Sequence, residues 1–171
     1  MIIPTLETER LTLRAPREDD VAPLAAFFAG PRSASLGGPQ AHWQVWRGHA
    51  MVIGHWHMRG YGFWSVDEKS TGNFAGRVGL WYPHDWPEPE IGWTLVDGAE
   101  GRGIAREAAL ASRNYAYESL GWTTAISLIA PDNQRSIALA QRLGAVYEAP
   151  FQHPQYGPMG IYRHPAPETL R

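Results

Sequence analysis

The chain has 171 residues, 44% of them hydrophobic and 19% charged, which suits one globular domain with a substantial core. A formal net charge of −2 argues against nucleic-acid partners, and the absence of cysteine excludes disulfides, zinc–thiolate sites and a covalent acyl-cysteine. Met1 to Leu6 is too short an apolar run for a signal peptide or a membrane span, so we expect a cytoplasmic protein with no membrane partner.

The first half of the chain predicts strands and two helices. Leu6 to Arg14 alternates polar and apolar residues as a first strand, and Val21 to Phe28 is an apolar run that favours a helix. Ala41 to Met58 predicts a second helix, and the segments 61–66 and 73–82 predict a hairpin. We expect the second helix to carry a stripe formed by Trp43, Trp46, Ala50, Ile53 and His57.

A strand, a glycine-rich turn and a helix start follow one another at the centre of the chain. Glu90 to Val96 is short and mostly apolar, as in a buried strand, and a helical pattern begins at Ile104. Gly98, Gly101 and Gly103 lie between them. Glycines let the backbone approach a ligand closely, and the free N–H groups at a helix start favour an anion. The segment therefore predicts a phosphate site.

Two common phosphate motifs do not fit this turn. A nucleotide triphosphatase loop needs Lys followed by Ser or Thr, but Gly103 is followed by Ile104 and Ala105. A dinucleotide fingerprint needs a third spaced glycine, and Arg106 stands at that position.

The remaining elements lead to a polar tail. Gly121 is expected to cap the central helix, and Thr123 to Ala130 predicts a buried strand. Asp132 or Asn133 caps a further helix that Gly144 ends. The segments 146–151 and 159–163 favour two last strands. We expect one domain over residues 1–171, with its core at about 5–163 and a flexible tail over 164–171.

These motifs resemble the Gcn5-related N-acetyltransferase (GNAT) superfamily. Glu100-Gly-Arg-Gly103-Ile-Ala105 is similar to its acyl-CoA loop, although Glu100 replaces the usual Gln or Arg. Asn133, Ser136 and Leu143-Gly144 resemble an element of the RimJ/RimL branch, in which Ala145 stands where Phe is common. The strand Glu9-Arg-Leu-Thr-Leu-Arg14, with 59–64 and 90–93, extends the resemblance in order from about residue 5 to 147.

The resemblance implies an α/β (α+β) fold, a mixed, mostly antiparallel sheet of six to seven strands flanked by helices, and acetyl-CoA as the cofactor. It implies transfer of an acetyl group to a primary amine by direct attack in a ternary complex. The alternative is an acyl-CoA-binding sensor or assembly domain without catalysis. The cofactor-binding residues that the resemblance implies are Thr94, Leu95, Val96, Gly101, Arg102, Gly103, Ile104, Ala105, Asn133 and Ser136.

Two residues are candidates for catalysis. Ser136 carries a hydroxyl that can hydrogen-bond the departing thiol, and many GNAT enzymes instead use a tyrosine at the position that Ala140 occupies here. Strand alternation places Glu90 on one face with Gly92 and Thr94, and a partly buried carboxylate there can act as a base through water. Alternatively, Glu90 is a structural acid paired with an arginine such as Arg77.

The acceptor amine is less defined by the sequence. Asp85 and Glu88 are candidates for binding a cationic acceptor, and most tryptophans are expected in the core, with Trp43 and Trp86 lining a pocket. The acceptor is a small amine or a protein N-terminus, and the protein a monomer or homodimer. We expect no metal, because no carboxylate follows His49, His55 and His57 at ligand spacing.

Overall fold

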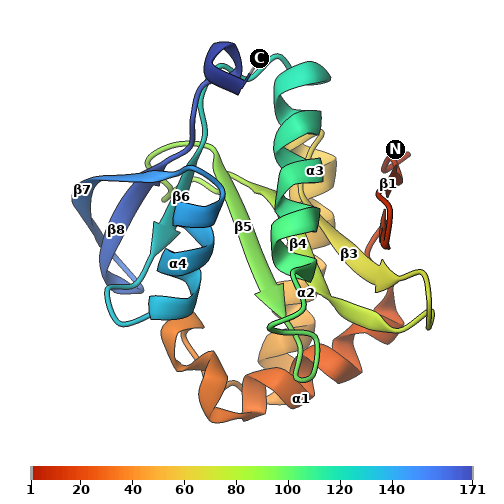
Figure 1. Ribbon diagram of the computed structural model, residues 1–171. Coiled ribbons are helices and arrows are strands. Elements are labelled where there is room, and N and C mark those ends of the chain that lie inside the picture. Colours follow the sequence, from red (N-terminus) through yellow and green to blue (C-terminus); the bar gives the residue numbers. More distant parts are fainter. Residues whose placement is uncertain (1, 171) are drawn as a thin grey trace.

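The computed structural model describes residues 2–170 and shows one sheet of eight strands in the order β1-β2-β3-β4-β5-β6-β8-β7. All neighbours in it are antiparallel except β5 and β6 (Figure 1). The strands are β1 (Leu6–Glu7), β2 (Leu11–Arg14), β3 (Phe63–Glu68), β4 (Phe74–Trp81), β5 (Glu90–Leu95), β6 (Ile126–Ile129), β7 (Val146–His153) and β8 (Gly157–Arg163). The helices are α1 (Val21–Ala29), α2 (His42–Arg59), α3 (Ile104–Glu118) and α4 (Gln134–Arg142), with 3-10 segments η1 (Glu18–Asp20), η2 (Pro31–Leu36) and η3 (Pro167–Leu170).

The sheet opens between β5 and β6. All six residues of β5 pair with β4, whereas β5 and β6 share the single register pair Glu90↔Ile126. Figure 1 shows the two strands diverging from that point, with α4 beside β6 and the N-terminus of α3 near the end of β5. The divergence leaves one edge of β5 without a neighbouring strand.

Helices cover both faces of the sheet. In Figure 1, α3 and α4 lie in front of it and α2 lies behind. Val78 and Leu80 of β4 pack with Ile104 and Ala108 of α3 in the main core, while Trp81 packs with Val52 of α2. Alternate residues of β4 and β5 therefore face the two helical layers, as the pleat requires.

The predicted elements are largely confirmed, with one strand more than expected. The segment Leu6 to Arg14 was predicted as a single strand and instead forms the two strands β1 and β2, paired as Leu6↔Leu13. The turn between them is held by Thr8, whose backbone N–H and hydroxyl both donate to the Leu11 carbonyl. Counting both strands gives eight in place of six or seven.

The predicted apolar stripe of α2 faces solvent. Trp43 is 58% and Trp46 48% exposed, and the other members are exposed as well. Two histidines lie on the buried face, where His49 Nε2 bonds to the Arg17 carbonyl and His55 Nδ1 to the Tyr61 carbonyl, each at 2.8 Å. A prediction based on apolar residues misses this buried face, because two hydrogen-bonded histidines form part of it. The buried residues of α2 are Val45, His49, Val52, His55 and Trp56.

The segment expected to be a flexible tail contacts the core as far as it is described. His164 is 2% exposed, and its Nε2 lies 3.0 Å from the Ser127 hydroxyl. Tyr117 of α3 donates to the Pro165 carbonyl at 2.9 Å. Across residues 2–170, no helix combines the length and the apolar composition needed to cross a membrane.

Candidate active site

A groove of about 1230 Å³ lies where β5 and β6 diverge. Its walls are η2, the end of β5, the loop before α3 with the first turn of α3, and α4. The predicted cofactor residues that line it are Thr94, Leu95, Gly101, Gly103, Ile104, Ala105, Asn133 and Ser136.

The glycine-rich turn forms one end of this groove. Gly101 and Gly103 have φ angles of 74° and 79°, a left-handed conformation that favours glycine, and Gly103 is the N-cap of α3. The N–H groups in the first turn of a helix have no partner within the helix. Arg106, Arg135 and Arg142 line the same groove and add positive charge. The arrangement suits an anionic group such as a diphosphate.

Only one residue of the predicted amide group 94–96 offers its N–H to the groove. The Val96 N–H donates to the Ala75 carbonyl of the neighbouring chain segment at 3.0 Å, so Val96 as an amide donor is wrong. Alternation along the strand turns the N–H of Thr94 toward β4 as well, and turns those of Trp93 and Leu95 toward the open edge. The hydroxyl of Ser127 donates to the Ile91 carbonyl at 2.6 Å, which confirms this direction.

Arg102 does not line the groove. Its guanidinium pairs with Glu68 of β3, with Nη1 2.8 Å from Oε1, on the other side of the turn. A side-chain contact from Arg102 to the groove is therefore absent in this structure.

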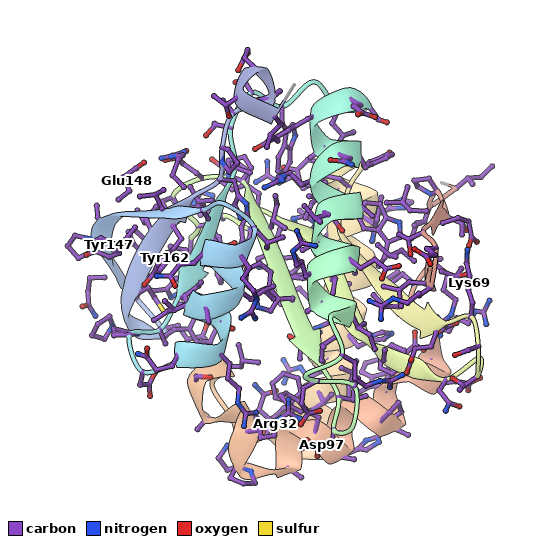
Figure 2. The ribbon with its side chains drawn as sticks, viewed as in Figure 1. Arg32, Lys69, Asp97, Tyr147, Glu148 and Tyr162 are labelled. Carbon is purple, nitrogen blue, oxygen red and sulfur yellow. The ribbon has the colours of Figure 1, made fainter. Side chains whose placement is uncertain are left out.

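Glu100 is held by an arginine from a distant segment. Arg32 of η2 forms an ion pair with Asp97 (Figure 2). It forms a second ion pair, at 3.2 Å, with Glu100. Both Arg32 and Glu100 line the groove. Arg32 Nε and Glu100 Oε2 are buried without a hydrogen-bond partner. The carboxylate that departs from the family pattern thus has a local counter-charge.

Glu90 is buried at the point where β5 and β6 meet, with 8% of its surface exposed. Burial raises the pKa of Glu90 to about 8, against two hydrogen bonds that favour the carboxylate. Trp86 Nε1 donates to Glu90 Oε2 at 2.6 Å, and the Leu128 N–H donates to the same oxygen at 3.3 Å. No ion pair of the described chain joins Glu90 to Arg77, so the predicted structural pair is absent.

The four acceptor candidates lie in different surroundings. Trp86 makes edge-to-face contacts with the rings of Trp81, His153 and Tyr156. Its indole N–H donates to Glu90. Glu88 forms a two-point ion pair with Arg163 at 2.5 and 2.7 Å, which occupies its carboxylate. Trp43 lies on the outer face of α2, outside both cavities described here. The exposed Asp85 lies 3.4 Å from His153 Nε2.

Ser136 is positioned by two neighbours. Its N–H donates to Asn133 Oδ1 at 3.2 Å, which caps α4 as expected. Trp93 Nε1 donates to Ser136 Oγ at 3.1 Å. A cavity of about 60 Å³ is lined by Glu90, Gly92, Trp93, Asn133 and Ser136, among others, and adjoins the groove through residues that line both.

Several residues of the site were not predicted. Alternation along β5 predicts that Trp93 faces away from Glu90. Its hydrogen bond to Ser136 could not be predicted, because that bond depends on how α4 packs against β5. Arg32, Ser35 and Leu36 come from η2, whose sequence shows only loop character. No local pattern places η2 against β5, since the contact joins segments about sixty residues apart.

The comparisons with known proteins agree with this geometry. The acetyltransferase (GNAT) domain family matches residues 10–146. The uncharacterized protein YkkB of Bacillus subtilis (strain 168) is 33% identical over 101 residues, 54% of this chain and 58% of that relative's length.

Solved structures extend the match to nearly the whole chain. An acetyltransferase from Agrobacterium tumefaciens str. C58 is 37% identical with a TM-score of 0.88, covering 96% of each chain. RimL, a ribosomal L7/L12 alpha-N-protein acetyltransferase solved with coenzyme A, shares the fold at 19% identity and a TM-score of 0.73, with 94% of this chain and 97% of that chain covered. GNAT acetyltransferases use acetyl-CoA, and the groove suits it: a glycine-rich turn before α3 lies at one end, and a smaller cavity adjoins the groove. The chain belongs to the GNAT acetyltransferase family, and its fold agrees with the RimJ/RimL branch.

Proposed function

We propose that the protein moves an acetyl group from acetyl-CoA to a primary amine, either of a small molecule or of a protein N-terminus. The observation that carries the proposal is the cavity that Glu90 and Ser136 line together beside the groove. Glu90 can take a proton from the amine, and Ser136 can donate a hydrogen bond to the departing sulfur.

Different residues of the groove bind different parts of the cofactor. The free N–H groups at the start of α3, with Gly101 and Gly103, hold the diphosphate, and Arg106, Arg135 and Arg142 add charge. The amides of Trp93 and Leu95 at the open edge of β5 pair with the pantetheine arm. When bound, acetyl-CoA supplies an activated thioester carbonyl.

Glu90 acts as the general base. Attack by an amine requires its neutral form, and a carboxylate with a pKa of about 8 accepts the ammonium proton, directly or through one water, more readily than an ordinary carboxylate. The Trp86 N–H and the Leu128 N–H fix the carboxylate beside the cavity.

Ser136 donates a hydrogen bond to the departing thiolate, which takes its proton from solvent. An indole N–H can only donate, so the bond from Trp93 makes Ser136 Oγ an acceptor and leaves the hydroxyl proton available. Because a thiol with a pKa of about 8.5 is a tolerable leaving group as the thiolate, no strong general acid is needed.

Thiol release from acetyl-CoA across a panel of amines tests the proposal. We expect Glu90→Gln to lower kcat roughly 10²–10⁴-fold and Ser136→Ala about tenfold, with the Kd for CoA within about twofold of wild type. Glu118→Gln, at an exposed carboxylate near the end of α3, is the matched control. Unchanged kcat in both active-site variants would contradict these roles.

A second reading is a domain that binds acyl-CoA without catalysis. Two observations favour it: Ala140 stands where many GNAT enzymes use a catalytic tyrosine, and Glu100 puts a carboxylate in the glycine-rich turn. Binding of CoA by calorimetry with no thiol release for any amine would support this reading over the enzyme.

A further inference from the structure

Arg77 of β4 carries a positive charge that no carboxylate of the described chain neutralises. None of the ion pairs among residues 2–170 includes it, and its Nε is buried without a hydrogen-bond partner. The residue still keeps some solvent exposure. A guanidinium withdrawn from water is costly unless something pairs with it.

The walls around Arg77 are aromatic. Its Cζ lies 5.7 Å from the ring centroids of both Phe28 in α1 and Phe63 in β3. Burial raises the pKa of the Tyr156 hydroxyl and the nearby Arg77 charge opposes that rise, so Tyr156 of the turn between β7 and β8 shares the same surroundings. Rings of this kind attract the cation but cannot neutralise it.

One acidic group on this side of the sheet, Asp20, is already engaged. Ser65, the β3 partner of Arg77 in register, donates to Asp20 at 2.6 Å. Asp20 is paired with Arg14 at 2.7 Å and accepts the N–H of Arg17 at 2.8 Å. It is therefore not a free counter-ion for Arg77.

Arg77 and Glu90 lie on the same face of the sheet. Arg77 pairs in register with Thr94, and Thr94 and Glu90 alternate onto one side of β5 with Gly92 between them. A Cβ on Gly92 would lie 2.8 Å from both Glu90 Oε1 and Phe63 Cζ, so these two side chains meet above that glycine. The ring of Phe63 therefore lies between Arg77 and Glu90, close to both side chains.

We propose that Arg77 binds a carboxylate of the acceptor, so that the substrate is a small amine that also carries a carboxylate group. This rests on the proposed function, in which Glu90 receives the proton of the amine. The acceptor lies along the face of β4 and β5, with its amine at Glu90 and its carboxylate at Arg77. The guanidinium forms two parallel N–H···O bonds to the carboxylate.

Pairs of acceptors that differ only in the carboxylate test the proposal. Thiol release is measured for phenylalanine against phenylalaninamide and for γ-aminobutyrate against butylamine. We expect wild type to favour the carboxylate member of at least one pair by about tenfold or more in kcat/KM. The amide bears the less basic amine, so its larger neutral fraction works against the expected preference for phenylalanine.

Variants of Arg77 assign the preference to this residue. We expect Arg77→Met to lower kcat/KM about 100-fold for the favoured carboxylate, mainly through KM, and less than about threefold for its uncharged partner, while Arg77→Lys keeps part of the preference. Arg47→Met is the matched control, because Arg47 also lies over an aromatic ring, Trp43, but on the exposed side of α2.

The outcomes separate this proposal from the function on which it rests. Equal turnover of both members of each pair in wild type, or an equal loss for both in Arg77→Met, would overturn the role of Arg77 and leave the acetyltransferase intact. A peptide with a free N-terminus, an amidated C-terminus and no acidic side chain, if acetylated in preference to every amino acid, would do the same. CoA binding without turnover of any amine would overturn both. The preference of wild type is measured without any variant, so a poorly folded variant does not block the test.

Discussion

Glu90 is a buried carboxyl group whose pKa, about 8, lies far above that of an ordinary glutamate. The desolvation that raises its pKa exceeds the effect of the bonds from Trp86 and Leu128. The same side chain therefore ties the activity and the stability of the protein to pH, and one isosteric substitution, Glu90→Gln, should remove both effects.

The activity should rise with pH until Glu90 is ionised. If it is the base, kcat/KM for the acceptor gains a limb that climbs as pH increases toward about 8 and then levels off. The acceptor amine adds its own titration, so the measurement compares pH profiles of wild type and Glu90→Gln with one amine. The limb near pH 8 should disappear in the variant. Identical profile shapes would contradict the assignment.

The free energy of unfolding should fall over the same pH range. Glu90 has an ordinary pKa of 4.5 in the unfolded chain and about 8 in the folded protein, so the folded state holds the proton that the unfolded state releases. The native state is thus favoured below pH 4.5 by this group, and that contribution is lost as pH rises through 8, by roughly 3–5 kcal/mol in all. Urea unfolding at several pH values should show a shallower decline for Glu90→Gln. Parallel curves would mean that the carboxyl group ionises normally.

Trp93 is expected to act through Ser136. Trp93→Phe keeps the ring but removes the N–H that donates to Ser136 Oγ. We expect kcat to fall about tenfold with the Kd for CoA unchanged, and no further loss when Ser136→Ala is added. Additive losses in the double variant would show that Trp93 and Ser136 act independently.

At the scale of elements, the sequence predicted those features that depend on the local pattern of residues. The periodicity of β5, the glycines before α3 and the Asn133 cap of α4 were enough to place the glycine-rich turn and Ser136 in order along the chain. Pattern does not say which edge of β5 is open, and so Val96 was assigned an amide that β4 occupies. The contacts of η2 depend on chain packing alone, which is why Arg32 was missed.

The pair between η2 and the phosphate turn should support cofactor binding. Arg32→Ala leaves Glu100 without its 3.2 Å partner beside the expected diphosphate, and we expect the Kd for CoA to rise about tenfold. Glu100→Gln in the same chain should restore most of the affinity, because it removes the uncompensated carboxylate. Calorimetry of the two single variants and the double variant measures the coupling. Additive effects would contradict a role for Arg32 in neutralising Glu100.

At the scale of the whole molecule, the sheet is two parts joined at one register pair. The β1–β5 part and the β6–β8 part meet at Glu90↔Ile126, and the groove occupies the space where they separate. The groove is lined by β5 of the first part, by η2, and by α4, which follows β6 of the second part. We therefore expect a bound cofactor to contact η2, β5 and α4 together.

Coenzyme A should therefore stabilise the molecule unevenly. At a concentration of 100 times its Kd, binding adds about 2.7 kcal/mol to the free energy of unfolding, which raises Tm with ligand concentration. Amide hydrogen exchange that occurs by local opening should slow in η2 and α4, which line the groove, and stay unchanged in β2 and β3, which do not. Mass-spectrometric exchange with and without CoA makes the comparison within one sample. Slowing confined to β2 and β3, or absent from α4, would show that the ligand does not bridge the opening between β5 and β6.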